Sequence, residues 1–522
     1  MRLLSPWIQA SRAVLAVSAS LTFVTPVTAQ RLTPLVYTIS VSSPSTPVAS
    51  VEVHVPTRKG ATVDLMMPVW SPGFYRVEDY AAKVQDFSAR TANGTALTVE
   101  QPAKNRWRVT TNGASSIVVS YKLLCDGRSV TTNAVTPDYG IFNGSATYIT
   151  LAEQTQRPIE VRVQLPAEWP QAATSLAAAS DGIANHFRAV NYDELNDSPI
   201  LAGKLSTHEF TVAGSTHLLV DAGDLGPWDG ARAAQNIERF VKVNAAFWGT
   251  LPFKRYVFLS LFRRGGGGLE HLNSSLLTSS ATAAAPGGTL RWFNFVSHEY
   301  FHALNVKRLR PIELGPFDYE HPPSTSSLWI SEGLTSYYGE LFTARAGLTT
   351  LQEYLGSMSA HITGVQNSPG RLVQTLEQSS LAVWTSGGTS GVGQDPKTTV
   401  SYYEKGPVVG FLLDAHIRRV TNGRKSLDDV MRLAYKRYGG KRGFTPVEFR
   451  KVAEQIASED LSAWFTRAIA STEELDFAEA LEWYGLRFAA SDEPMKRWTL
   501  EVRPDASDPQ RAHLQALAGV LP

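Results

Sequence analysis

The stretch His298-Glu299-Tyr300-Phe301-His302 places two histidines four residues apart, in a segment from Leu290 to Leu309 that is typical of a helix ended by Pro311. A helix turns by about 100° per residue, so the two imidazoles lie on one side, about 40° apart. That geometry allows both to bind one Zn²⁺. Glu299 lies roughly 60° beyond His302 on the same side, where its carboxylate can act as a general base without being a ligand.

The pattern alone has an alternative interpretation, because a chance pair of surface histidines gives the same spacing. The residues around the pair argue against a solvated helix. Phe293, Val296, Tyr300 and Leu304 form an apolar face along the segment. Such a face predicts a helix that packs against the rest of the protein.

A second segment, residues 329–338, reads WISEGLTSYY and predicts the start of another helix. A catalytic zinc needs three protein ligands and an open position for water. No third histidine follows close behind His302 at the metzincin spacing, and the next one is His321, between Glu320 and two prolines. We therefore predict Glu332 as the third metal ligand, on a helix that packs against the first. The alternative is a solvated glutamate on a helix face.

Two further stretches contain candidate site residues. Residues 400–406, VSYYEKG, open a predicted helix that runs to Val420. A phenol aimed at the zinc could stabilise an oxyanion, although tyrosines at such positions more often serve packing.

Residues 265–271, GGGGLEH, follow the predicted strand Tyr256–Phe262. A glycine run permits close backbone approach by a ligand. Phosphate is one candidate, but neither a GxxxxGK motif nor a GxGxxG motif after a first βα unit is present. By itself, Glu270 reads as a loop carboxylate.

The rest of the chain divides into two unlike regions. Residues 30–225 contain short β-rich runs separated by Gly, Pro, Asn and Asp, which predicts an antiparallel β-sandwich-like domain. Residues 226–486 follow a helical period, with capping-box patterns at Thr350 and Thr445. The fold class we predict is therefore multidomain α+β, with a β-rich domain before a mainly helical one. Residues 487–522 are too few for a further ordinary domain.

Composition excludes several classes of protein. The chain has 522 residues with a net charge of +1, so no electrostatic feature predicts a nucleic acid or an anionic membrane as the main partner. It contains one cysteine, Cys125, which rules out an intrachain disulfide and any zinc site made of several cysteines. Nothing in the sequence indicates an oligomeric state.

The first 29 residues resemble an export signal. Two arginines precede an apolar run of about 12 residues, and Val27-Thr28-Ala29 offers small residues for cleavage. The run is too short to span a bilayer, and an uncleaved membrane anchor is the alternative. We expect a signal peptide at 1–29 and export to a bacterial periplasm or secretion, with no stable membrane insertion after cleavage.

Four motifs in order, GGLEH, HEYFHALNVKRLRP with GPFDYE, WISEGLTSYYGE and YEKG, resemble the glycyl aminopeptidase family of gluzincin zinc metallopeptidases. The likeness extends from about residue 31 to 490. It implies a thermolysin-like catalytic domain in which His298, His302 and Glu332 hold one Zn²⁺ per chain and Glu299 is the base. Tyr403 matches the family's transition-state tyrosine. Glu270 matches the glutamate that binds the substrate's free α-amino group.

This resemblance implies a zinc aminopeptidase that cleaves the first peptide bond of substrates with free N-termini, with a preference for Gly or Ala. Gly267 and Gly268 would pair with the substrate backbone as an added strand. An endopeptidase of the same fold, an epoxide hydrolase and a non-catalytic zinc-binding protein are the alternatives. Relatives commonly carry a C-terminal PDZ domain, and residues 487–522 are too short for one, so we expect it to be absent or reduced.

Overall fold

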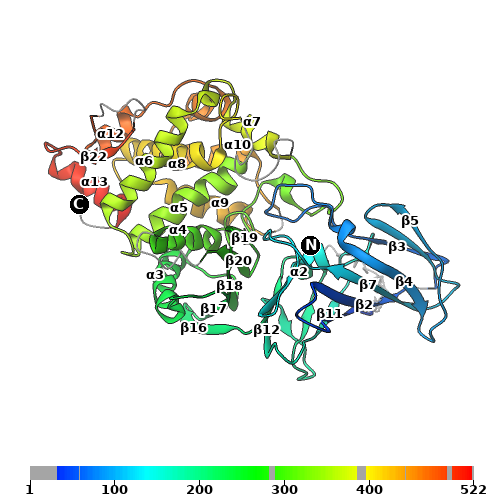
Figure 1. Cartoon of the computed structure of the whole chain (residues 1–522). Helices are drawn as coiled ribbons and strands as arrows, with labels where there is room; N and C mark the ends of the chain where they lie inside the picture. Colours follow the sequence, from blue (N-terminus) through cyan, green and yellow to red (C-terminus); the bar gives the residue numbers. More distant parts are fainter. Residues whose placement is uncertain are drawn as a thin grey trace, which may run out of the picture.

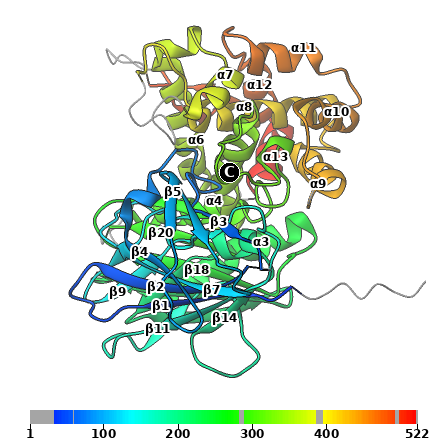
Figure 2. The same ribbon diagram turned by 90° about the vertical axis from the view of Figure 1, so that its right-hand side faces the viewer.

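The computed structural model describes residues 32–57, 59–280, 288–384, 395–440, 442–490 and 497–519. The predicted export signal at 1–29 lies outside these ranges. Figure 1 shows the N-terminal strands gathered on one side of the molecule and the helices on the other, and Figure 2 shows the same division after a quarter turn. The predicted order of a β-rich part followed by a mainly helical part is therefore confirmed.

The N-terminal part is built around a seven-stranded sheet in the order β13-β14-β11-β1-β2-β7-β4. All its pairs are antiparallel except β1 with β11, which run parallel. Alternate residues of the long strands are buried, which places Tyr37, Val51 and Val53 in one core. The strands are β1 (Leu35–Ser40), β2 (Val48–Pro56), β4 (Val84–Thr91), β7 (Ser116–Leu124), β11 (Ile159–Gln164), β13 (Ala177–Ala178) and β14 (His186–Ala189).

Two four-stranded antiparallel sheets complete this part, in the orders β10-β3-β6-β5 and β12-β15-β9-β8. Short helices connect the strands. The elements are β3 (Thr62–Met66), β5 (Val99–Ala103), β6 (Arg106–Thr110), β8 (Ala134–Val135), β9 (Tyr139–Phe142), β10 (Thr150–Leu151), β12 (Gln171–Ala173) and β15 (Ile200–Gly203), with η1 (Tyr80–Lys83), α1 (Gly144–Thr147) and α2 (Tyr192–Asn196).

A five-stranded sheet, β16-β17-β18-β20-β19, lies between the two parts. Its strands are β16 (Ser206–Val212), β17 (Ser215–Gly223), β18 (Arg255–Phe262), β19 (Gly267–Glu270) and β20 (Ser274–Ser279). β17, β18 and β20 run parallel, and β19 pairs antiparallel at the edge. β16 and β17 precede residue 225 and the other three strands follow it, so this sheet crosses the domain boundary predicted there. The predicted domain limits stay predictions.

The helical part packs around α8, whose residues Lys405–Arg418 are all buried. It comprises α3 (Gly230–Trp248), α4 (Gly288–Phe301), η3 (Ile312–Leu314), η4 (Trp329–Gly333), α5 (Leu334–Arg345), α6 (Leu351–Asn367), η5 (Pro369–Leu372), α7 (Leu376–Leu381), η6 (Ala382–Trp384), α8 (Tyr402–Val420), α9 (Leu427–Tyr438), α10 (Pro446–Ala457), α11 (Ser462–Phe465), η8 (Thr466–Ala470), α12 (Ala478–Tyr484) and α13 (Asp508–Ala518), with a small hairpin of β21 (Leu486–Phe488) and β22 (Leu500–Val502). Within the described ranges, every helix is too short or too polar to cross a bilayer.

The helix that carries the histidine pair is shorter than its sequence predicts. α4 ends at Phe301 rather than Leu309, and His302 lies in the turn that follows. Val306 adopts a φ of 125°, which is incompatible with a continuing helix. The backbone NH of His302 still donates to the carbonyl of His298 at 3.2 Å, so the one-turn spacing of the two imidazoles is preserved.

Candidate metal centre

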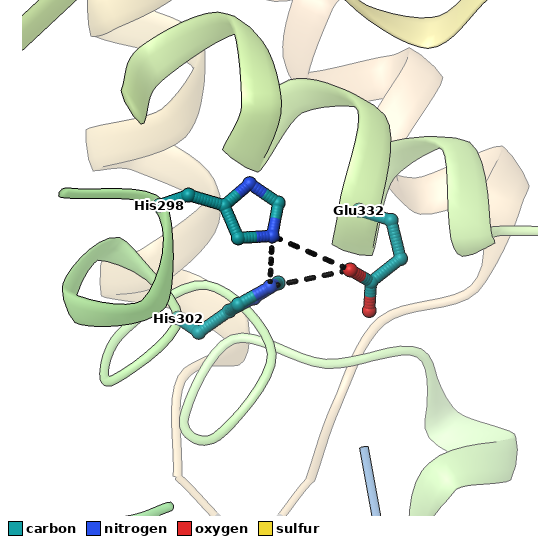
Figure 3. Close-up of side chains that lie close together, drawn as sticks. All are labelled: His298, His302 and Glu332. Carbon is teal, nitrogen blue, oxygen red and sulfur yellow. Dashed lines mark hydrogen bonds and ion pairs between the residues drawn. The ribbon is translucent and has the colours of Figure 1, made fainter. Parts of the chain in front are cut away.

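Three side chains point toward a common centre (Figure 3): His298 in the last turn of α4, His302 in the turn that follows α4, and Glu332 in the π-helical turn before α5. The two Nε2 atoms are 3.0 Å apart. Glu332 Oε2 lies 3.2 Å from Nε2 of His302 and 3.8 Å from Nε2 of His298. His302 and Glu332 are almost fully buried, and His298 is 16% exposed, so the centre opens on the His298 side.

Hydrogen bonds at the far side of each imidazole fix which nitrogen faces the centre. Nδ1 of His302 lies 2.9 Å from the carbonyl oxygen of Asn305, so it carries the proton and donates. Ser336 Oγ donates to the carbonyl of Glu332 at 2.9 Å and can therefore accept from Nδ1 of His298 at 3.3 Å. In a neutral imidazole with its proton on Nδ1, the lone pair is on Nε2, so each ring can offer Nε2 to a metal.

The Asn305 side chain joins the two segments that carry the candidate metal ligands. Its Nδ2 donates at 2.9 Å to the carbonyl of Ile330 and at 2.9 Å to Oγ1 of Thr335. Asn305 is fully buried. One residue thus orients His302 through its carbonyl and holds the Glu332 turn through its side chain, a role that the sequence analysis missed.

Three carboxylates gather beside the two histidines. Glu270, Glu299 and His302 each offer an atom within 4.8 Å of the others, and all are buried. Burial raises the pKa of Glu270 to about 7 and raises the pKa of Glu299 well above its usual range. Burial alone would also raise the pKa of Glu332, but the neighbouring His302 holds it below its usual value. This excess of acidic groups favours a bound cation.

Glu299 lies against the edge strand β19. An added Cβ at Gly268 would come within 2.0 Å of Glu299 Oε1 and 2.7 Å of Phe295 Cε2. Glycine at 268 is therefore required by the close packing of β19 on α4, a reason that the sequence analysis did not give. The predicted contacts of Gly267 and Gly268 with a substrate stay predictions.

Glu270 ends β19 and is only 4% exposed. Its Oε1 atom has no hydrogen-bond partner among the described residues. On one side it is covered by Gly73 of the N-terminal part, where an added Cβ would lie 2.3 Å from Oε1. A buried carboxylate with an unpaired oxygen is costly unless a cation or donor binds it.

The peptide after Glu270 is held by Asp197, a residue that the sequence analysis did not single out. Asp197 accepts from Nδ1 of His271 at 2.9 Å, from Nζ of Lys307 at 2.9 Å and from the backbone NH of Leu272 at 2.8 Å. Asp197 directly follows α2 of the N-terminal part. The conformation of the GGLEH segment thus depends on a carboxylate from the other part of the chain.

Tyr403 is the second residue of α8 and lies beside the candidate metal ligands. Its ring centroid lies 6.2 Å from that of His298. Burial raises the pKa of Tyr403 well above its usual value, and the charge of Glu332 adds to the increase, so the phenol stays protonated at neutral pH. The structure therefore brings the predicted site residues together except Gly267, which is exposed and lies against Val130.

Two family models match the chain: the Peptidase M61 N-terminal domain over residues 36–204, and M61 glycyl aminopeptidase over residues 291–409. No curated protein matches it. A solved aminopeptidase N family protein from Idiomarina loihiensis is similar at 27% identity and a TM-score of 0.82, covering 87% of this chain and 78% of that one.

An M1 zinc metallopeptidase from Deinococcus radiodurans shares the fold at 14% identity and a TM-score of 0.50, covering 85% of this chain and 95% of that one. A mutant of it bound to a Tyr-Ser-Ala substrate gives 0.52 with the same identity and coverage. These matches bear out the resemblance carried by the four motifs and identify a peptidase of metallo-aminopeptidase type. The chain belongs to the M61 glycyl aminopeptidase family.

Proposed function

We propose that the protein is a zinc-dependent aminopeptidase that removes the first residue from peptides with free N-termini. The observation that supports it most is the convergence of His298, His302 and Glu332 beside the buried carboxylates Glu299 and Glu270. Two histidines and one glutamate are a ligand set of catalytic zinc sites, which keep a fourth position open.

The trio fits the size and chemistry of zinc. Ligand atoms about 2.1 Å from a tetrahedral zinc lie about 3.4 Å apart. The three separations among His298, His302 and Glu332 are 3.0, 3.2 and 3.8 Å, which bracket this value. Both imidazoles also present the nitrogen that a metal requires. We infer one zinc per chain, held by these three residues.

When bound, zinc supplies Lewis-acid chemistry that polarises the scissile carbonyl and activates water near neutral pH. Glu299 is not part of the trio and lies next to it, so its carboxylate takes the proton of the attacking water and passes it to the leaving amine. Tyr403, a protonated phenol at the same centre, donates a hydrogen bond to the oxyanion that forms.

Glu270 binds the ammonium group of the substrate's first residue. An ammonium placed there would pair with the buried Oε1 atom, which has no other partner among the described residues. This contact fixes the number of residues between the amino terminus and the cleaved bond at one. The family's description supports a preference for glycine as the first residue, and alanine, one methyl group larger, is the next smallest candidate.

The metal and base assignments are tested together. The purified protein should contain about one zinc per chain and lose activity with 1,10-phenanthroline. Glu299→Gln should keep its zinc but lose about 10²–10⁴-fold in kcat. An active preparation that is free of zinc would disprove the metal assignment, and near-normal turnover by the Gln variant would disprove the base.

The amine-anchor assignment is tested with blocked substrates. We expect wild type to cleave one residue from free peptides and to leave N-acetylated analogues nearly untouched. Glu270→Gln keeps the shape and removes the charge, and should lower kcat/KM on free peptides by about 10- to 100-fold. Glu270→Ala should do the same while retaining zinc. Cleavage of acetylated peptides at internal bonds by wild type would instead identify an endopeptidase.

We also propose that the protein is exported, with residues 1–29 as a cleaved signal. The charged start, the short apolar run and the small residues before residue 30 support this. N-terminal sequencing of the protein recovered from the periplasm or medium should begin near Gln30. A mature protein that still starts at Met1 would contradict cleavage.

A further inference from the structure

One loop of the N-terminal part enters the core of the helical part. Residues 70–75, between β3 and η1, carry Tyr75, which is 1% exposed and packs in the same hydrophobic core as α4, α5 and α8. Its ring lies edge-on to Trp384, with 6.0 Å between centroids. The Tyr75 side chain therefore belongs to the core of the helical part, although the loop that carries it belongs to the β-rich part.

The hydroxyl of Tyr75 reaches the predicted third metal ligand. It donates to Oε1 of Glu332 at 3.2 Å. The other oxygen, Oε2, is the one that faces Nε2 of His302 and His298. The two oxygens of this buried carboxylate thus have separate tasks: one is held by Tyr75, and the other faces the metal centre.

The charged and titratable groups around Tyr75 leave its hydroxyl in the protonated, donating form. Glu332, Glu270 and Tyr402 lie near enough to interact electrostatically with the Tyr75 hydroxyl. Tyr403 approaches the carboxylate of Glu332 from α8. A phenol has an ordinary pKa of about 10, so the Tyr75 hydroxyl carries its proton at neutral pH and can donate. Loss of the phenol proton would place another negative charge against Glu332, which the buried site disfavours.

The loop is held firmly enough to fix a ligand. Nε1 of Trp70 donates to the carbonyl of Asp318 at 2.8 Å, and Ser145 Oγ donates to the carbonyl of Trp70 at 3.1 Å. Ser71 Oγ lies 2.9 Å from the hydroxyl of Tyr80. Gly73 has a φ of 93°, a conformation that favours glycine and lets the loop lie against Glu270.

We propose that Tyr75 is a positioning residue for the metal: its hydrogen bond to Oε1 of Glu332 orients the carboxylate so that Oε2 binds the ion alone. The proposal rests on the zinc site of the proposed function. Partners behind metal ligands orient them, and their loss costs about 10- to 100-fold in metal affinity. The β-rich part thereby contributes directly to zinc affinity across the boundary between the two parts.

The test is the zinc affinity of the full-length apoprotein, measured by competition with a chelating indicator dye. Tyr75→Phe removes only the hydroxyl and keeps the ring against Trp384. We expect its zinc dissociation constant to rise by about 10- to 100-fold. The matched control is Tyr80→Phe, which removes a buried hydroxyl from the contacts of the same loop and touches no predicted ligand; its affinity should stay within about two-fold of wild type.

A second measurement isolates the contact itself. In a Glu332→Gln background, Tyr75→Phe should weaken zinc binding much less than it does in the wild-type background, because the charged acceptor of its hydrogen bond is already gone. Melting temperatures of wild type, Tyr75→Phe, Glu332→Gln and the double variant, all measured without zinc, check that each protein of this cycle is folded.

The outcomes separate the two proposals. Wild type that binds no zinc would overturn the proposed function. Wild type that binds zinc, with Tyr75→Phe binding it equally well, would overturn this inference alone. An equal loss in the Tyr80→Phe control, or an unchanged effect in the Glu332→Gln background, would show that Tyr75 acts through packing of the loop, and would also overturn it.

Discussion

A single methyl group at residue 268 should disable the proposed aminopeptidase without disturbing its proposed zinc site. Gly268 lies in β19, opposite Leu277 of β20, and faces α4. A Cβ built there would lie 2.0 Å from Oε1 and 2.3 Å from Cδ of Glu299, and 2.7 Å from a ring carbon of Phe295. None of these contacts is tolerable, so Gly268→Ala must displace either the strand or the carboxylate proposed as the base.

The size of the effect follows from the displacement. Ordinary contact with a Cβ begins near 3.4 Å, so the Glu299 carboxylate or β19 has to move by more than 1 Å. A misplacement of about 1 Å at a reacting group costs about 10²-fold in rate. We therefore expect Gly268→Ala to lower kcat/KM by about 10²-fold. Zinc content should be unchanged, because none of the contacting atoms belongs to His298, His302 or Glu332.

The assay is hydrolysis of glycyl and alanyl amides, with zinc determined on the same samples. Gly266→Ala is the matched control in the same glycine run, since its added Cβ would meet only the carbonyl oxygen of Thr278, at 3.7 Å. It should stay within about three-fold of wild type. The reasoning fails if Gly268→Ala keeps wild-type activity, or if both alanine variants lose activity equally.

Three other perturbations have defined outcomes. Tyr403→Phe, assayed at saturating zinc, should lower kcat by about 10²–10³-fold, and an unchanged kcat would exclude Tyr403 as the oxyanion donor. Asp197→Asn leaves the buried Lys307 without its carboxylate and should destabilise the protein by about 3–5 kcal/mol, measured by denaturant unfolding; an unchanged midpoint would refute the pairing. Burial raises the pKa of Asp221 to about 7, so its folded form keeps a proton that the unfolded chain releases, and this contribution to stability is present below about pH 4 and lost as the pH rises toward 7. Asp221→Asn should therefore melt higher than wild type at about pH 8 and about equally near pH 4, which thermal scans at both values would check.

Patterns confined to one helix were read correctly from the sequence. The capping boxes at Thr350 and Thr445 are both present, each with its side chain accepting from the third helical residue. The histidine pair faces one point, as the helical angle predicts. These features depend on dihedral angles and spacings over three or four residues, which are fixed by local geometry. The end of α4 was misjudged: the helix stops at Phe301, and Val306, beyond it, adopts a positive φ that nothing in its side chain announces.

Asp197 and Tyr75 could not be found in this way. Tyr75 is 257 residues from Glu332, and Asp197 is 110 residues from Lys307. Each is one polar residue in a region that reads as β-rich, and neither has a motif around it. Their roles arise only when the two parts of the chain dock, which is decided by the summed packing of many side chains rather than by any one of them. A buried donor or carboxylate at that contact must be paired, because an unpaired one costs as much as a lost hydrogen bond or more. The requirement for pairing thus links the docking of the β-rich part to the geometry of the proposed zinc and amine sites. Substitutions along this contact should change peptidase activity even where they lie far from the HExxH motif in sequence.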